Sequence, residues 1–256
     1  MRKNALKGKL ATGQRVCGVL LDFNNPELLE LFGHLGYDFV FIDGQHSGLT
    51  VETARQLIRA ADASGLSTLV RVARNDASVI LEYLDMGAGG IIVPNITTRA
   101  DVQAAVAATK YPPAGRRGGF GRSRAANYGV TQSQQEYFTL ANDETLFVPL
   151  IEDEAALEHL AEICGAPGVD VVLIGPGDLA LSMGMPGGWS AAPVQEAVER
   201  IRSAAAAAGK PAMIAALDAA DGRKLYRQGF QALLVSAAAV IADAAGGFLR
   251  DVERAR

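Results

Sequence analysis

The stretch STLVRVARNDASVILEYLDMGAGGIIVP (Ser67–Pro94) contains the repeating unit of the fold. It opens with one apolar run, STLVRV (Ser67–Val72), and closes with another, GGIIVP (Gly89–Pro94). Both runs are continuously apolar rather than alternating, which is typical of parallel strands buried on both faces. The segment between them, Ala77–Met86, has a helical pattern. The stretch therefore predicts a strand–helix–strand unit of a parallel sheet.

The same rhythm extends along the rest of the chain. Apolar runs predict further strands at Val16–Phe23, Asp38–Asp43, Thr145–Glu152, Val169–Gly175, Pro211–Ala216 and Gln231–Ser236. Helical patterns fill the intervals at Pro26–Gly33, Val51–Ser64, Arg99–Ala108, Asp153–Ile163, Pro193–Ala208, Ala219–Arg227 and Ala237–Arg254. Eight strands alternating with helices over 256 residues predict an α/β fold, a (β/α)8 TIM barrel in a single domain over residues 1–256. A doubly wound open sheet is the alternative, but LDFNNPE (Leu21–Glu27) lacks the glycine-rich first turn of such sheets.

Composition narrows the class of protein. With 49% hydrophobic residues the chain can bury a sizeable core, which excludes intrinsic disorder. The 24 Lys and Arg against 28 Asp and Glu include no concentrated basic run, so no nucleic-acid partner is expected. The apolar run after the basic start, Val16–Leu21, is too short for a signal peptide or a membrane span. The two cysteines, Cys17 and Cys164, cannot form a disulfide framework. A cytoplasmic enzyme without membrane contact is therefore expected.

One connection between predicted strands is longer than a single helix and its two loops require. About fifty residues separate the fourth predicted strand from the fifth, and the helical pattern accounts for only some of them. The segment YPPAGRRGGFGRSRAANYG (Tyr111–Gly129) is rich in Gly and Arg and has no periodicity. Long irregular loops in compact domains usually carry function. Arg116, Arg122 and Arg124 could bind an acidic substrate, or could instead bind neighbouring subunits and backbone carbonyls.

Polar residues follow several of the predicted strands. They are Asp43, His46, Arg71, Glu152 and Asp178. Catalytic groups of TIM barrels project from the carboxyl ends of the strands and from the loops that follow. Because the pattern recurs on several strands, these residues predict an active site at one end of the barrel.

Glu152 and Asp178 follow neighbouring strands, which lie about 4.8 Å apart in a sheet. Two carboxylates so placed repel each other unless a cation or a proton lies between them. An oxygen-rich site of this kind suits Mg²⁺, Mn²⁺ or a similar divalent ion. Alternatively, Glu152 caps the helix that follows it and Asp178 begins another. The coincidence at adjacent strand ends favours metal binding.

Two basic residues, His46 and Arg71, complete the predicted site. His46 lies in the turn DGQHSG (Asp43–Gly48), and a histidine is suited to moving protons near neutral pH. His34 and His159 lie in helical patterns, where packing or surface roles are expected. Arg71 interrupts an apolar strand, and a buried arginine is costly unless it pairs with an anion. It therefore either pairs with a barrel carboxylate or binds a substrate oxygen.

Two absences bear on the chemistry. A Schiff-base aldolase needs a lysine that projects into the site, and none of the six lysines follows a predicted strand. Phosphate-binding barrels use glycine-rich loops after the last two strands, whereas those loops here read ALDAADG (Ala216–Gly222) and SAAAVIAD (Ser236–Asp243). A phosphorylated substrate is therefore disfavoured.

Six segments, in chain order, resemble the HpcH/HpaI aldolase family. They are FVFIDGQHSGLT (Phe39–Thr50), TLVRVARND (Thr68–Asp76), GAGGIIVPNITT (Gly87–Thr98), YPPAGRRG (Tyr111–Gly118), PLIEDEAAL (Pro149–Leu157) and VVLIGPGDLALSMG (Val171–Gly184). The resemblance covers nearly the whole chain, and the combination of segments is specific. It implies a phosphoenolpyruvate/pyruvate-type barrel and a metal-dependent (class II) pyruvate aldolase. Substrates of such enzymes include 4-hydroxy-2-oxoheptanedioate and keto-deoxy sugar acids, which are cleaved to pyruvate and an aldehyde.

The resemblance also implies roles for individual residues. Glu152 and Asp178 would bind Mg²⁺, Mn²⁺ or Co²⁺, and Arg71 would hold the keto or enolate oxygen of the pyruvate unit. Backbone amides around Gly177 and Asp178 would receive its carboxylate. His46 would be the catalytic base or would orient a water that is the base, and Asp85 falls where the family has an aspartate that pairs with this histidine. A homo-hexamer is implied, with the last helix, residues 237–254, exchanged between subunits.

The chain departs from the family pattern at two places beside the site. Many members carry Glu where this chain has Gln45, and a polar residue where it has Leu150. Both departures affect substrate fit and metal affinity more than reaction type. Two other functions remain open on the sequence: a lyase acting on a coenzyme A ester, of the citrate or malyl kind, and a non-catalytic ligand-binding barrel.

Overall fold

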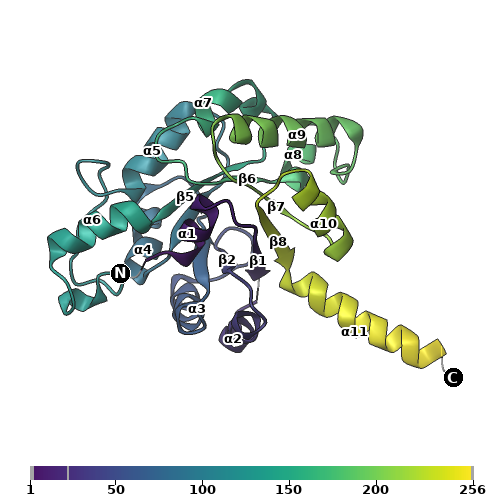
Figure 1. The fold of residues 1–256 in the computed structure, drawn as a ribbon, viewed down its shortest axis with the longest axis horizontal. Helices are drawn as coiled ribbons and strands as arrows, with labels where there is room; N and C mark the ends of the chain where they lie inside the picture. The colour runs from purple at the N-terminus through teal and green to yellow at the C-terminus, as the bar shows by residue number, and fades with distance from the viewer. Residues whose placement is uncertain (1–2, 22, 255–256) are drawn as a thin grey trace.

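The computed structural model, which describes residues 3–21 and 23–254, is a closed barrel of parallel strands surrounded by helices (Figure 1). The strands follow one another around the barrel in sequence order, and the last pairs with the first. They are β1 (Val16–Leu21), β2 (Phe39–Asp43), β3 (Ser67–Arg71), β4 (Gly90–Val93), β5 (Leu146–Ile151), β6 (Val172–Ile174), β7 (Ala212–Ala215) and β8 (Ala232–Ser236). The predicted (β/α)8 fold is confirmed, and each strand lies within its predicted range. Asp22, in the first of those ranges, lies outside the described residues.

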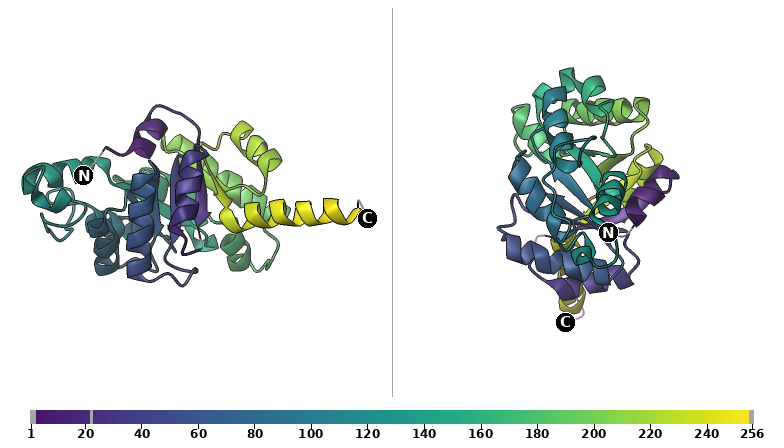
Figure 2. Two further views of the ribbon diagram at one scale, coloured as in Figure 1. Left: turned by 90° about the horizontal axis from the view of Figure 1, so that it is seen from below. Right: turned by 90° about the vertical axis from the view of Figure 1, so that its left-hand side faces the viewer.

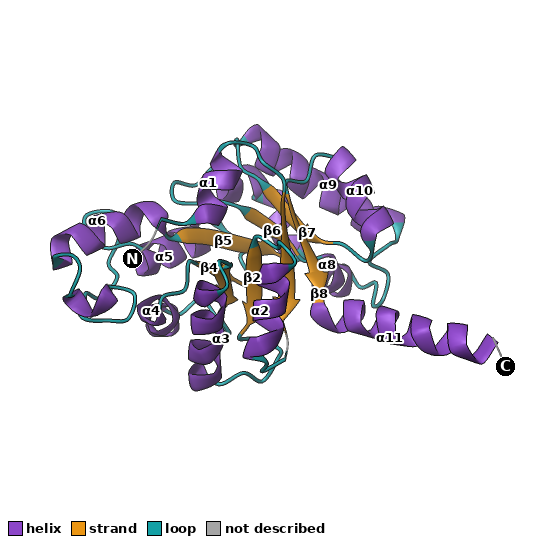
Figure 3. Cartoon of the chain, turned by 60° about the horizontal axis from the view of Figure 1, so that its bottom comes forward, coloured by secondary structure: helices purple, strands orange, loops and turns teal. Residues whose placement is uncertain are grey.

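Most helices run back along the outside of the barrel between consecutive strands (Figure 3). Those that match the predicted patterns are α2 (Pro26–His34), α3 (Val51–Ala63), α4 (Ala77–Met86), α5 (Arg99–Thr109), α9 (Ala192–Ala207), α10 (Ala219–Arg227) and α11 (Ala237–Arg254). Side-chain caps fix several of their starts. Thr50 accepts the backbone N–H of Thr53 at α3, and Thr98 with Asp101 forms a capping box at α5.

The core has two layers, because each strand buries both of its faces. Side chains between strands and helices form the outer layer, and those pointing inward, among them Phe39, Phe41 and Leu69, fill the barrel. The helix α1 (Ala5–Ala11), which the sequence did not predict, adds buried Leu6 and Leu10 to the inner layer. Helix α1 therefore closes the amino end of the barrel and leaves the carboxyl end for a site.

Four further elements correct the sequence-based description. The single helix expected at Asp153–Ile163 is divided into the 3-10 helix η2 (Glu154–Glu158) and the short helix α7 (Leu160–Cys164). Helix α8 (Pro176–Ser182) follows β6 directly, and helix α6 (Gln134–Glu144) precedes β5. Helix α6 lies where no helix was predicted, and α8 matches the helix at Asp178 that was considered only as the alternative to metal binding.

The long connection between β4 and β5 forms a lobe on one side of the barrel, at the left of Figure 1. We define the β4–β5 lobe as residues 111–144. It contains a 3-10 turn, η1 (Asn127–Gly129), helix α6 and a small core of its own, in which the ring of Tyr111 stacks on that of Phe138 with centroids 3.9 Å apart. The predicted irregular segment is thus a packed part of the domain.

Helix α11 leaves the barrel at the opposite side from the β4–β5 lobe and extends outward (Figures 1 and 2). Its first residue, Ala237, is fully buried, but large apolar side chains farther along it are exposed. They include Ile241, Phe248, Leu249 and Val252. No helix among the described residues has both the length and the apolar character needed to cross a membrane.

Candidate active site

Asp43 organises the carboxyl end of β2. The register of β2 and β3 places it opposite Arg71, and its carboxylate accepts hydrogen bonds from Arg71 Nε at 2.9 Å and Arg71 Nη2 at 2.5 Å. The same carboxylate accepts the backbone N–H groups of Gln45 and His46 at 2.9 and 3.2 Å. Burial by itself raises the pKa of Asp43, but Arg71 and the two N–H donors outweigh it and hold the pKa below its usual value. Asp43 therefore stays ionised and fixes both the turn and the arginine.

Arg71 makes the pairing that was one of its two predicted roles. The bidentate pair with Asp43 is nearly buried, with 11% of the Arg71 side chain and 6% of the Asp43 side chain exposed. The pair engages Nε and Nη2 and leaves Nη1 outside the fork. A guanidinium held at two points has a fixed direction. The pairing thus orients Arg71 and leaves one of its nitrogens for an oxygen in the site.

His46 follows Asp43 in the same turn. Its backbone N–H bonds to Asp43, and the hydroxyl of Ser47 donates to the Asp43 carbonyl oxygen, which closes the turn. The His46 residue is exposed at this end of the barrel. The turn thus presents the imidazole to solvent beside the Asp43–Arg71 pair.

Glu152 and Asp178 approach each other from neighbouring strands. Glu152 follows β5 and is 5% exposed, and its Oε1 accepts the backbone N–H of Asn95 at 3.0 Å. Asp178 lies in the first turn of α8, just after β6. Burial raises the pKa of Glu152, and the charge of Asp178 raises it further, against the opposing effects of the Asn95 N–H and Arg71. The site thus holds two mutually repelling carboxyls, one buried and one exposed.

This donor set suits a hard divalent cation. It offers carboxylate oxygens alone, which Mg²⁺ and Mn²⁺ prefer, and a cation between the two groups would remove their repulsion. The described residues contain no cluster of three or more His, Cys, Asp or Glu side chains that could hold a metal. Glu152 and Asp178 are therefore the residues of this site that could hold such an ion.

One other predicted residue, Gly177, lies beside the pair. Gly177 is exposed at the start of α8, and nothing lies within 4 Å of the position where a Cβ would be. The first N–H groups of a helix have no partner inside it. The backbone of Gly177 therefore borders open space, and the N–H groups at this helix start can donate to a ligand there.

Asp85 is not brought to His46 within this chain. It lies near the carboxyl end of α4, which runs back to the amino end of the barrel, and its carboxylate pairs with Arg117 Nη2 at 2.8 Å. The expected Asp85–His46 pairing is therefore absent from the described part of the chain. Arg117, to which the sequence analysis gave no role, is fully buried, and its guanidinium lies 4.5 Å from the centre of the Tyr111 ring. Its sequence signals were its place in the arginine-rich segment and in the family-like segment YPPAGRRG (Tyr111–Gly118).

The other arginines of the β4–β5 lobe were expected to bind either an acidic substrate or neighbouring subunits and backbone carbonyls. Arg124 pairs with Asp62 at 2.5 Å and donates to the carbonyl oxygen of Met86 at 2.8 Å, which supports a structural role. Arg116 and Arg122 are exposed, so both interpretations stay open for them.

The two departures from the family pattern lie beside the site. Leu150 is buried in the barrel interior, and the buried Oε1 of Gln45 has no hydrogen-bond partner among the described residues.

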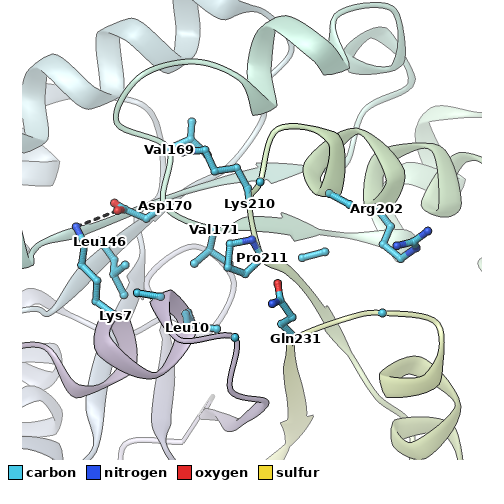
Figure 4. Close-up of a pocket in the computed structure, with 16 residues that line it drawn as sticks. Lys7, Leu10, Leu146, Val169, Asp170, Val171, Arg202, Lys210, Pro211 and Gln231 are labelled. Atoms are coloured by element: carbon cyan, nitrogen blue, oxygen red, sulfur yellow. Dashed lines mark ion pairs between the residues drawn. The ribbon is translucent and has the colours of Figure 1, made fainter.

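The lysines take no place in this site. Lys110 is buried, and burial lowers its pKa to about 8. However, its Nζ donates to the carbonyl oxygens of Asn142 and Thr145 at 2.6 and 2.8 Å, at the amino end of β5. A cavity of about 570 Å³ also lies at the amino end, where Lys7 pairs with Asp170 at 2.9 Å (Figure 4). The candidate site at the carboxyl ends of the strands is therefore separate from Lys110 and from this cavity.

Comparison with known proteins agrees with this geometry. Residues 17–238 match the family described as HpcH/HpaI aldolase/citrate lyase. A hydroxypyruvate/pyruvate aldolase of Sagittula stellata is 38% identical over 196 residues, which cover 77% of this chain and 76% of that protein. A 5-keto-4-deoxy-D-glucarate aldolase of Escherichia coli K12 is 32% identical over 226 residues, 88% of this chain and 87% of the relative.

A solved structure extends the similarity to the whole fold. The HpcH/HpaI aldolase/citrate lyase family protein from Burkholderia cenocepacia superposes with a TM-score of 0.93 at 30% sequence identity, covering 98% of this chain and all of that one. The family match spans the barrel from β1 to the start of α11, including every strand end described above. The chain belongs to the HpcH/HpaI aldolase/citrate lyase family.

Proposed function

We propose that the protein is a divalent-metal-dependent aldolase that cleaves 4-hydroxy-2-oxo acids reversibly to pyruvate and an aldehyde. The observation that carries this proposal is the pair of facing carboxyls, Glu152 and Asp178, beside the oriented guanidinium of Arg71. Aldol cleavage leaves a pyruvate enolate, so a site for it must stabilise negative charge on oxygen. Metal dependence replaces the Schiff-base lysine that this site lacks among its described residues.

Glu152 and Asp178 would hold the ion, Mg²⁺, Mn²⁺ or Co²⁺. When bound, it supplies Lewis-acid polarisation of the keto acid and neutralises the charge that develops on the keto oxygen. The pair fits this task because burial and mutual repulsion disfavour two bare carboxylates at this position.

The remaining groups act on the substrate. The N–H groups of Gly177 and Asp178 receive its carboxylate, and Arg71 donates to its keto oxygen. His46 accepts the proton of the 4-hydroxyl, directly or through a water, and the bond between C3 and C4 then breaks to release the aldehyde. Arg71 stabilises the enolate oxygen until C3 is protonated to give pyruvate. Asp43 contributes by holding Arg71 and the His46 turn in place.

The names of the relatives support a hydroxylated or acidic aldehyde partner. One relative is a hydroxypyruvate/pyruvate aldolase and another a 5-keto-4-deoxy-D-glucarate aldolase. We therefore propose keto-deoxy sugar acids, with 4-hydroxy-2-oxoheptanedioate, as the first substrates to test. The family also includes citrate lyases, so cleavage of a coenzyme A ester is the second candidate.

Pyruvate release from a panel of 4-hydroxy-2-oxo acids tests the proposal. We expect pyruvate, measured with coupled lactate dehydrogenase, to disappear when a chelator removes divalent ions and to return when Mg²⁺, Mn²⁺ or Co²⁺ is added. The same preparations should leave citryl- and malyl-coenzyme A intact. Pyruvate release that persists in chelator, or cleavage of the coenzyme A esters alone, would contradict the proposal.

We also propose that α11 packs against a second copy of the chain in a homo-oligomer, with a hexamer as the expected assembly. Its support is the exposed apolar surface on a helix that extends away from its own barrel (Figure 2). Exposed apolar patches of this kind usually mark protein interfaces. The residues 1–256 would then form a single barrel domain completed by the neighbouring chain.

Charges placed on this helix should reduce the assembly. In Phe248→Glu/Leu249→Glu, two side chains that are 69% and 60% exposed in one chain would bring unpaired charges into an apolar interface. We expect light scattering after size exclusion to show a lower mass for this variant than for the wild-type protein. Leu35→Glu, which changes a leucine 64% exposed on the C-cap of α2, is the matched control and should keep the wild-type mass. An unchanged mass for the double variant would argue against the interface.

A further inference from the structure

The turn after β4 has an unusual backbone. Asn95 has a φ of 56°, in the left-handed region that residues other than Gly, Asn and Asp rarely adopt. Its side chain is exposed, so burial does not require an asparagine here. In this conformation the chain turns from β4 toward α5 while the Asn95 N–H stays 3.0 Å from Glu152 Oε1. The bond thus depends on a turn that few residue types can form.

Gly175, the residue directly after β6, also lies against Glu152. A Cβ at this position would lie 3.0 Å from the Glu152 Cβ, 3.2 Å from the Leu150 Cδ1 and 3.3 Å from the Glu152 Oε2. These contacts are tighter than ordinary Cβ contacts, so a side chain at 175 would require Glu152 and Leu150 to shift by a few tenths of an ångström. The Asn95 N–H therefore holds one oxygen of Glu152, and the missing Cβ of Gly175 leaves room for the other.

We propose that Asn95 and Gly175 are positioning residues that aim the Glu152 carboxyl at the divalent ion. This inference rests on the proposed function, because it assigns Glu152 the role of metal ligand. Groups that hydrogen-bond to a ligating carboxylate commonly change metal affinity when they are altered, although they do not touch the metal. Here the fixed N–H selects one orientation of a buried side chain, and the missing Cβ leaves that orientation free.

A direct titration of Mn²⁺ tests the inference without an activity assay. The electron paramagnetic resonance signal of free Mn²⁺ gives the dissociation constant for the full-length chain and its variants. Asn95→Val should weaken binding about tenfold, because a β-branched residue is strained at this φ and the turn will relax away from Glu152. Gly175→Ala should weaken it by a similar factor, about tenfold, because its methyl group would displace the Glu152 side chain. Asn95→Gly, which keeps the turn and its N–H, should bind within about twofold of wild type.

Asn127 provides the matched control. It is also an asparagine in the left-handed region, with a φ of 51°, but it lies in the β4–β5 lobe. Asn127→Val carries the same strain and should leave Mn²⁺ binding unchanged, while thermal unfolding without metal shows that both valine variants are folded. Gly175→Ala decides the question alone if Asn95→Val does not fold.

Each result has a distinct meaning. If the wild-type chain binds no Mn²⁺, the proposed function fails and this inference fails with it. If wild type binds but Asn95→Val and Gly175→Ala bind equally well, the positioning role is wrong and the metal site stands. Weaker binding by Asn127→Val to the same degree would also overturn it, since the effect would then be a general consequence of strain.

Discussion

Glu152→Gln is expected to reduce metal-dependent pyruvate release by about a thousandfold, because it removes one of the two proposed protein ligands and the charge that attracts the cation. Losing several kcal/mol of Lewis-acid stabilisation corresponds to a factor of this size. The substitution keeps the size and shape of the side chain, and its amide oxygen can still accept the Asn95 N–H. It also removes a buried carboxyl whose pKa is raised by burial, so folding should not suffer. The measurement is kcat at saturating Mg²⁺, together with the Mn²⁺ dissociation constant.

Glu154→Gln is the matched control for this variant. Glu154 lies two residues farther along, is exposed and belongs to η2. Its change should leave both kcat and Mn²⁺ affinity at the wild-type values. If Glu152→Gln kept more than a tenth of the activity with unaltered Mn²⁺ affinity, Glu152 would not be a ligand, and the metal would have to bind elsewhere.

Arg71→Lys is expected to lower kcat by a factor of about 100 to 1,000, the usual effect of removing one donor to a developing oxyanion. A lysine keeps the positive charge beside the buried carboxylate of Asp43, which protects the fold. It cannot reproduce the two-point pair with Oδ1 and Oδ2, so no donor remains aimed at the enolate oxygen. Steady-state kinetics should show the loss mainly in kcat, with the melting temperature close to that of wild type.

Arg74→Lys separates this effect from a general change of charge. Arg74 lies on the loop that follows β3, with 69% of its side chain exposed, and it pairs with the Asp76 carboxylate at 4.0 Å. Its conservative substitution should leave kcat unchanged. An Arg71→Lys variant with activity within threefold of wild type would show that Arg71 serves only as the partner of Asp43.

Much of the fold follows from local patterns in the sequence. Continuous apolar runs and amphipathic intervals predicted each strand and most helices, since burial on both faces leaves a strong signal. Helix α6 was missed although Ser133 and Glu136 form a capping box that could have indicated its start. Helix α1 was missed because a short basic segment gives no sign that Leu6 and Leu10 enter the barrel.

The residues of the site were predictable where they lie at or directly after the carboxyl end of a strand. Glu152, Asp178, Arg71 and His46 all lie at the predicted end of the barrel because parallel strands share one direction. The contacts made by backbone were not predictable, since the Asn95 N–H reaches Glu152 from a different strand. The fate of Asp85 depended on the path of the β4–β5 lobe, which brings Arg117 to it and which no local pattern describes.

The closed strand order has a consequence for how this enzyme can diversify. The described residues to which we assign chemistry all lie at the ends of strands β2 to β6 or directly after them, a contiguous part of the ring. The loops after β7 and β8 border the same opening but carry none of those assigned groups. Under the proposed function, substitutions in these loops would change which aldehyde is accepted, while the groups that form and protonate the enolate would be inherited unchanged.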